Sequence, residues 1–113
     1  MAIPTISDDP MYQLIRSEQI KDFNEQREGA DLSCLKGGDY RGLDMRGFNA
    51  DGLDLSGAYF RNTDLRGIDF RNTVLDGASF RDAKVSGCYF PKGISAAELR
   101  MSLEFGTRIR NRG

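Results

Sequence analysis

The sequence predicts a solenoid, a fold in which short structural units stack along one axis. Between residues 33 and 92 an apolar residue recurs at every fifth position, in a stretch that is otherwise polar and charged. An α-helix has a period of 3.6 residues and a plain strand a period of 2, so neither explains a five-residue period. We call these the central positions: Leu35, Tyr40, Met45, Ala50, Leu55, Phe60, Leu65, Phe70, Leu75, Phe80, Val85 and Phe90.

Two further columns keep the same five-residue frame. The residue two positions before each central position is small or apolar throughout. Two positions after it, eleven of the twelve residues are glycine, asparagine or aspartate, which tolerate a positive φ. The chain is therefore expected to turn a corner every five residues.

Several of these units resemble a known repeat family. The segments AYFRN at 58–62, TDLRG at 63–67 and ASFRD at 78–82 look like the A-(D/N)-L-x-x unit of pentapeptide repeat proteins. The resemblance covers 60 of the 113 residues. It implies an all-β solenoid, a right-handed quadrilateral β-helix with one repeat on each face and four in each coil, hence three coils.

Residues twenty positions apart should then stack, and they group by shape. On the fourth face Phe48, a paired inward residue, can restore the bulk that Ala50 lacks, as a filled core requires. The expected stacks are Leu35, Leu55 and Leu75 on the first face; Tyr40, Phe60 and Phe80 on the second; Met45, Leu65 and Val85 on the third; Ala50, Phe70 and Phe90 on the fourth.

The flanking segments read as helical caps, which gives three parts: 1–32, 33–92 and 93–113. Asp9 is a helix N-cap followed by proline, and the apolar stripes to about residue 28 predict two short helices or one bent helix with a break near Ser17. Gly29 stops it, and the chain then leads into the first coil. A β-helix exposes strand edges at both ends, which favours capping over the alternative of partner-binding helices.

The C-terminal segment begins where Pro91 breaks the repeat. Ser95 and Glu98 form a capping box, and a helix over about 96–105, closed by Gly106, is expected to be the second cap. The final Arg108, Arg110 and Arg112 form a basic tail. This tail can hold an anion or merely solubilise the end of the chain.

Composition argues against chemistry at an active site. The chain has no histidine, the commonest general base and metal ligand, and its two cysteines do not make a zinc site. Cys88 is inward and Cys34 outward in a different coil, so no disulfide is expected. We predict no catalytic residue, no cofactor and no metal. Residues 1–4 start no signal peptide and no apolar run matches a membrane span, so a cytoplasmic location is expected.

One surface feature does not follow from the repeat alone. Outward arginines stack as Arg41, Arg61 and Arg81 on the second face, and as Arg46 and Arg66 above Ser86 on the third. Asp39 can balance Arg41, and Asp44 and Asp64 can balance the third-face pair. Arg61 and Arg81 have only Tyr59 and Ser79 beside them on their own face. The candidate interaction surface is Arg41, Tyr59, Arg61, Arg81, Arg46 and Arg66.

Three functional interpretations follow. The preferred one is a non-enzymatic interaction or scaffold module of bacterial type with a protein partner, present as a monomer or as a homodimer through a capped end. The resemblance also implies a DNA mimic that binds a type II topoisomerase, which the length of about 15 Å and the arginine ladders disfavour. The third is phosphate or nucleic-acid contact through the arginine face, which the eight acidic residues among the repeats disfavour.

Overall fold

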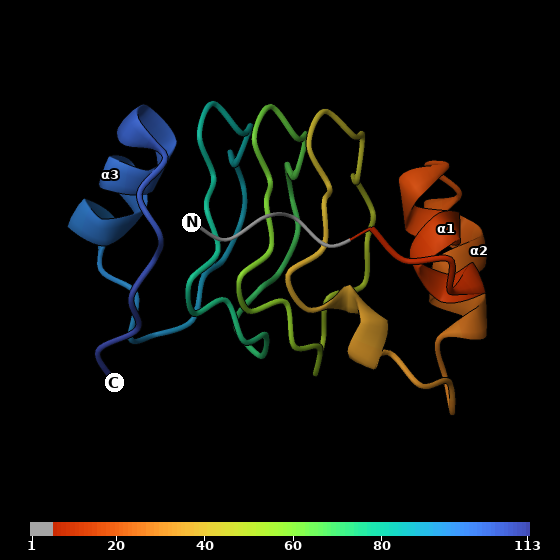
Figure 1. Ribbon diagram of the computed structural model, residues 1–113. Coiled ribbons are helices and arrows are strands. Elements are labelled where there is room, and N and C mark those ends of the chain that lie inside the picture. The colour runs from red at the N-terminus through yellow and green to blue at the C-terminus, as the bar shows by residue number, and fades with distance from the viewer. Residues whose placement is uncertain (1–5) are drawn as a thin grey trace.

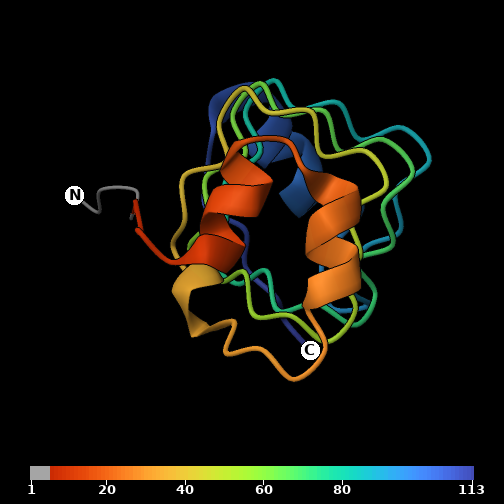
Figure 2. The ribbon, with the colours of Figure 1, turned by 90° about the vertical axis from the view of Figure 1, so that its right-hand side faces the viewer.

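The computed structural model describes residues 6–113 as a stack of backbone turns with helices at both ends (Figure 1). The elements in chain order are α1 (Pro10–Arg16), α2 (Ile20–Gln26), the 3-10 helix η1 (Ser33–Leu35) and α3 (Ala96–Phe105). Along the stack axis, α1 and α2 lie across one end and α3 lies at the other (Figure 2). The expectation that residues 1–4 start no signal peptide falls outside the described residues.

The predicted twenty-residue spacing is confirmed by the backbone pairing. Parallel bridges join residues twenty positions apart on all four faces, such as Tyr59 with Ser79 and Asp64 with Lys84. The amide of Leu65 donates to the carbonyl of Lys84 at 2.9 Å, and the amide of Lys84 donates to the carbonyl of Thr63 at 3.0 Å. We call residues 33–52, 53–72 and 73–92 the first, second and third coil.

The all-β class is not confirmed. Within residues 6–113 the pairing consists of isolated bridges, with no continuous strand, and the regular elements are helices. The reason is the short face. A corner every five residues leaves one residue per face, the one before the central position, in bridging geometry. The right-handed β-helix stays a prediction.

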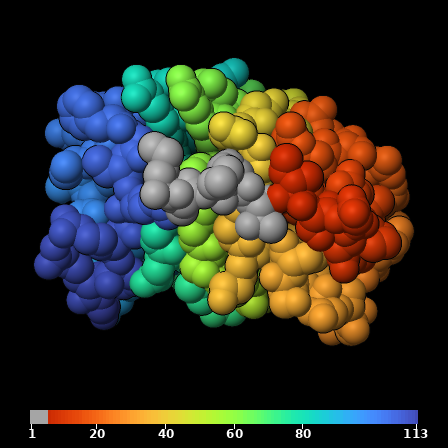
Figure 3. Space-filling model, viewed as in Figure 1, coloured from red at the N-terminus to blue at the C-terminus, as the bar shows by residue number. Residues whose placement is uncertain are grey.

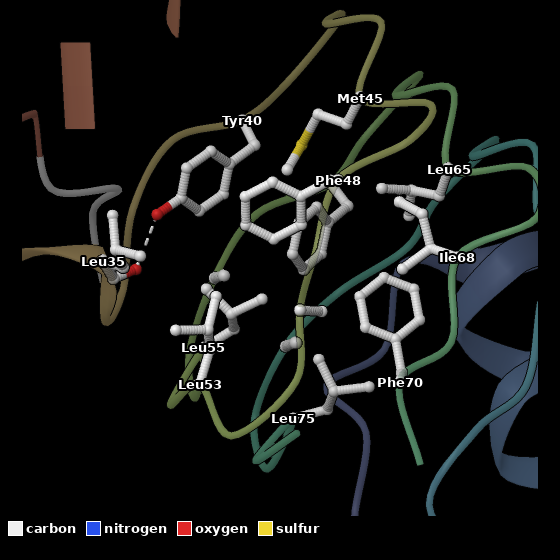
Figure 4. Close-up of a cluster of buried hydrophobic side chains, with 14 of the residues drawn as sticks. Leu35, Tyr40, Met45, Phe48, Leu53, Leu55, Leu65, Ile68, Phe70 and Leu75 are labelled. Carbon is white, nitrogen blue, oxygen red and sulfur yellow. Dashed lines mark hydrogen bonds between the residues drawn. The ribbon is translucent and has the colours of Figure 1, made fainter. Parts of the chain in front are cut away.

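The apolar residues of the repeats fill the interior of the stack (Figure 4). The rings of Tyr40, Phe60 and Phe80 lie one above another, with centroids 5.4 Å and 5.0 Å apart. Ten of the twelve central residues are buried, and only Val85 and Phe90 in the third coil are partly exposed. Burial of each large side chain contributes roughly 2 kcal/mol, so this column of rings is a major source of stability.

The corners take the backbone conformation that the sequence predicts. Ten of the twelve corner residues have a positive φ, including Asn62 at 59° and Asp82 at 58°. Asn72 does not, although asparagine tolerates a positive φ, as Asn62 shows. Its amide Nδ2 instead donates to the Asp51 carboxylate at 3.0 Å.

Polar residues of the small inward column join consecutive coils. The hydroxyls of Thr63 and Thr73 donate to the carbonyls of Tyr40 and Ala50 at 2.6 Å and 2.8 Å. The thiol of Cys88 lies 2.9 Å from the Leu65 carbonyl in the same relation. In each case the acceptor is the central residue 23 positions earlier, so an inward hydroxyl or thiol satisfies a buried carbonyl of the coil below.

The starts of α1 and α3 and the end of α3 lie where the sequence indicates, whereas α2 ends at Gln26, before the predicted stop at Gly29. The Asp9 carboxylate accepts from the Met11 amide and Pro10 opens α1, while Ser17 ends it, so the two-helix alternative is correct. The Ser95 hydroxyl accepts from the Glu98 amide at 3.1 Å and caps α3. Gly106 ends α3 in the left-handed conformation. In a capping box the Glu98 side chain would also accept from the backbone amide of Ser95. Here the Glu98 carboxylate accepts from Arg110 instead.

The outward placement of Cys34 is wrong. Residues 33–35 form η1 instead of a flat face, and Cys34 is half-buried against the core beside the start of α1. Burial and the nearby Asp9 carboxylate raise the pKa of its thiol, and burial raises that of Cys88. Both cysteines are free thiols, as predicted.

Candidate interaction surfaces

Arg41 is neutralised on the second face. Its guanidinium grips the Asp39 carboxylate with Nε and Nη2, both at 2.9 Å. Asp39 is only 5% exposed, and the hydrogen bonds from Arg41 hold the pKa of its carboxyl below the usual range. An arginine engaged in this two-pronged way offers little free charge to a partner.

Two arginines and two aspartates form a charge network on the third face. Arg46 and Arg66 each grip the aspartate two positions earlier, at 2.8 Å to Asp44 and 2.7 Å to Asp64, and Arg46 also lies 3.5 Å from Asp64 in the next coil. Hydrogen bonds from Arg46 lower the pKa of Asp44 to about 2. The predicted local pairing of these arginines is present.

Arg61 and Arg81 differ from one another. Among residues 6–113 the structure shows no ion pair for Arg61. Arg81 forms an ion pair with the corner residue Asp82, whose carboxylate lies 3.7 Å from the guanidinium. The comparison of residues on the same face did not predict this pair. Both partners are about half exposed, so solvent weakens this pair.

Tyr59 is held by the C-terminal tail. The Nη2 atom of Arg108 donates to the Tyr59 hydroxyl at 2.8 Å, and its guanidinium lies over the ring at 5.5 Å from the centroid. Sequence reasoning placed Arg108 in a basic tail and Tyr59 beside Arg61, with no signal that would join them. The second face therefore carries Arg108 of the tail in addition to its own Arg61 and Arg81.

The tail is part of the fold, not a free basic extension. Ile109 is buried and pairs with the third coil in both directions, through the amide of Gly77 at 2.7 Å and the carbonyl of Ala78 at 2.8 Å. Arg110 is paired with Glu98 at 3.1 Å. The tail thus occupies the place of a further coil at the corner between the first and second faces.

At the N-terminal end, side chains take the hydrogen-bonding places that a preceding coil would fill. The Tyr12 hydroxyl donates to the Asp39 carbonyl at 2.8 Å, where the equivalent Tyr59 carbonyl accepts from the amide of Tyr40. The Glu18 carboxylate accepts from the Asp44 amide. The remaining donors of this kind are Arg16 to the Arg41 carbonyl, Asn24 to that of Gly47 and Arg27 to those of Asn49 and Asp51.

At the C-terminal end the second face is completed by α3. The Phe80 amide donates to the Ser102 hydroxyl at 2.8 Å, and the Asp82 amide donates to the Leu103 carbonyl at 3.0 Å. The space-filling view shows the segment with α1 and α2 (red and orange) and the C-terminal segment (blue) at opposite ends, with the repeats between them (Figure 3). The terminal helices therefore bond directly to the outermost coils.

These surfaces present charged groups and hydrogen-bonding groups. Across residues 6–113 no group of three or more acidic or cysteine side chains is arranged to hold a metal ion. None of the helices in this described part is long and apolar enough to cross a membrane.

Comparison with known families agrees with the spacing of the repeats. The family model for pentapeptide repeats matches residues 54–90 in eight copies. Residues 54–90 of this chain are pentapeptide repeats. The match covers most of the second and third coils, whereas the first coil, whose opening residues form η1, lies outside it. No curated protein and no solved structure matches the chain.

Proposed function

We propose that this pentapeptide repeat chain is a non-catalytic module that binds another protein through its second face. The observation that carries the proposal is the uneven neutralisation of the arginines. Arg41, Arg46 and Arg66 each grip an aspartate at 2.7 to 2.9 Å, whereas no ion pair engages Arg61 among residues 6–113. Of the six residues of the candidate interaction surface, the proposed binding anchors are Arg61 and Arg81. Arg108, which lies beside Tyr59, is a third anchor.

We also propose an architecture for the module. Residues 33–92 form a right-handed β-helix of three coils, residues 6–32 cap its start, and residues 93–113 cap its end. Support comes from the parallel bridges at twenty-residue spacing and from the helix side chains that bond to the first coil. A rigid frame of this kind holds the second-face side chains in fixed positions, which lowers the entropy cost of binding.

The chemistry of the second face selects the kind of partner. Arginine and tyrosine are enriched among residues that dominate binding energy at interfaces. A guanidinium without an ion pair fits a carboxylate on the partner in the same two-pronged way in which Arg41 grips Asp39. The proposed partner is therefore a protein with an acidic surface.

The test is a quantitative pulldown with two matched double variants. R61E/R81E reverses the proposed anchors, and R46E/R66E reverses the same charge on the neighbouring face. Loss of capture of tenfold or more is expected for the first variant and little loss for the second, since hot-spot residues contribute about 2 kcal/mol each. Circular dichroism melts of both variants establish that they remain folded.

Two outcomes contradict the proposal. Equal capture by wild type and both variants would make the arginine face an ordinary solvated surface. Capture that disappears on nuclease treatment would assign the face to nucleic acid in place of an acidic protein.

A further inference from the structure

The two ends of the stack are completed to different extents. At the N-terminal end, side chains of the helical segment bond to first-coil backbone groups on the second, third and fourth faces. At the C-terminal end, α3 and the tail bond to the second face and its corner with the first. Among residues 6–113, none bonds in this way to the third and fourth faces of the third coil.

The uncovered faces carry backbone groups without a hydrogen-bond partner among residues 6–113. In the second coil the equivalent groups are all paired with the third coil, for example the amides of Leu65, Gly67 and Phe70 at 2.7 to 3.0 Å. In the third coil they have no acceptor or donor within the described chain. The unpaired groups are the amides of Val85, Gly87 and Phe90 and the carbonyls of Ala83 and Cys88.

The side chains beside this edge are also more exposed than their equivalents in the second coil. Leu65 and Phe70 in the second coil are fully buried, whereas Val85 and Phe90 directly above them are partly exposed. Tyr89, on the fourth face, is 58% exposed. We call residues 83–90 the open edge.

We infer that the open edge binds a segment of another polypeptide that runs as half of an additional coil. An exposed edge with alternating donors and acceptors pairs with an added strand. A straight strand satisfies only one face, since the chain bends at the Ser86–Gly87 corner, where Gly87 has a φ of 73°. The occupant must therefore turn a corner itself. It needs a glycine or asparagine at that corner and a second one five residues later.

Charge adds a second requirement on the occupant. On the third face the column of bridged residues runs Asp44, Asp64, Lys84. The last member is exposed and has no ion pair within residues 6–113. An acidic residue in the next position of the column would lie about 4.8 Å from Lys84. The occupant is thus an extended segment with an acidic residue before its first apolar residue, where it faces Lys84, and a turn residue at the corner.

The second coil supplies the probe for this inference. A capped ten-residue peptide with the sequence of residues 63–72, TDLRGIDFRN, carries the required acidic, apolar and corner residues. In the register of the coils, its two aspartate amides would donate to the carbonyls of Ala83 and Cys88. Its aspartate carbonyls would accept from the amides of Val85 and Phe90.

Titration of the labelled full chain with this peptide, followed by NMR, tests the inference. At millimolar peptide the amides of Val85, Gly87 and Phe90 are expected to shift and to exchange more slowly, while those of Leu65 and Phe70 are unchanged. The control peptide has the same sequence with N-methyl groups on both aspartates. It loses two donors and should bind at least tenfold more weakly.

A charge swap separates specific docking from general stickiness. Lys84→Glu should weaken binding of the peptide, and replacement of the first peptide aspartate by lysine should restore it. Equal binding of the native and N-methylated peptides would overturn the inference, as would the absence of any shift at the open edge. So would slow exchange of Val85, Gly87 and Phe90 in the free protein, because a second copy of the chain would then already cover the edge.

Discussion

Arg108 donates a hydrogen bond of 2.8 Å to the Tyr59 hydroxyl across 49 positions of sequence. The same arginine donates to the Gly77 carbonyl at 3.3 Å, so one side chain joins the second coil, the third coil and the tail. Ile109, the next residue, is buried and pairs with the third coil through its backbone. The C-terminal tail is consequently a structural part of the surface proposed to bind a partner.

Arg108→Ala is expected to lower the free energy of unfolding by about 1 kcal/mol, through the lost hydrogen bond and the lost contact of the guanidinium with the ring. Chemical denaturation measures the change. Tyr59→Phe is the matched control, since it removes the hydroxyl and keeps the ring, and it should cost less. If both variants unfold at the wild-type midpoint, the tail is not held through Tyr59.

Leu65→Asp should unfold the protein. The side chain is fully buried between Met45 and Val85 in the third-face stack, so a carboxylate there would lose its hydration without a partner. Arg66→Asp, one residue away and exposed, is the control and should remain folded. A cooperative melt of Leu65→Asp within a few degrees of wild type would contradict the register.

The inward threonines offer a finer test of the packing between coils. Thr63→Val keeps the shape but leaves the Tyr40 carbonyl without the hydroxyl donor, which should cost about 1 to 3 kcal/mol because that carbonyl is buried. Thr63→Ser retains the hydroxyl and loses only a methyl group, so it should cost about 1 kcal/mol. Denaturation midpoints in the opposite order would show that the hydroxyl contributes nothing.

The repeat could be predicted from the sequence because its frame is local. Each corner depends on a residue such as Gly67 or Asn62, and each core position depends on a residue such as Leu65, so five letters suffice to define a unit. The start of α1 could likewise be predicted from Asp9 and Pro10, which determine a helix start locally. Whether one bent helix or two helices follow could not be decided from these residues.

What sequence reasoning missed depends on contacts between distant residues. The Arg108–Tyr59 pair forms only because Ile109 extends the ladder, and nothing near either residue indicates it. Cys34 fits the repeat frame, yet the start of α1 packs against it and residues 33–35 form η1. Asp82 occupies a corner position, and the repeat pattern does not indicate its proximity to Arg81.

Acid should destabilise the fold through the aspartates gripped by arginine. The pKa of Asp44 is lowered to about 2 from an ordinary value of 3.8, and Asp39, Asp64 and Asp69 are shifted in the same direction. A folded-state pKa below the unfolded one gives stability that is present above about pH 4 and is lost as the pH falls through the folded values. Denaturation midpoints should therefore fall between about pH 4 and pH 2.

Arg46→Gln isolates the contribution of one pair. It should raise the pKa of Asp44 toward its ordinary value, because hydrogen bonds from Arg46 are the largest cause of the shift. NMR titration of the Asp44 carboxyl measures this directly. An unchanged Asp44 titration in the variant would show that the ion pair is not formed in solution.

Native-state amide hydrogen exchange tests the stacked register most directly. The amides of Leu65 and Phe70 donate to carbonyls of the third coil, whereas those of Val85 and Phe90, twenty residues later, have no acceptor within residues 6–113. The structure predicts strong protection for the first pair and fast exchange for the second. Equal protection of both pairs, or fast exchange at Leu65 and Phe70, would contradict the twenty-residue stacking from which both proposed binding surfaces follow.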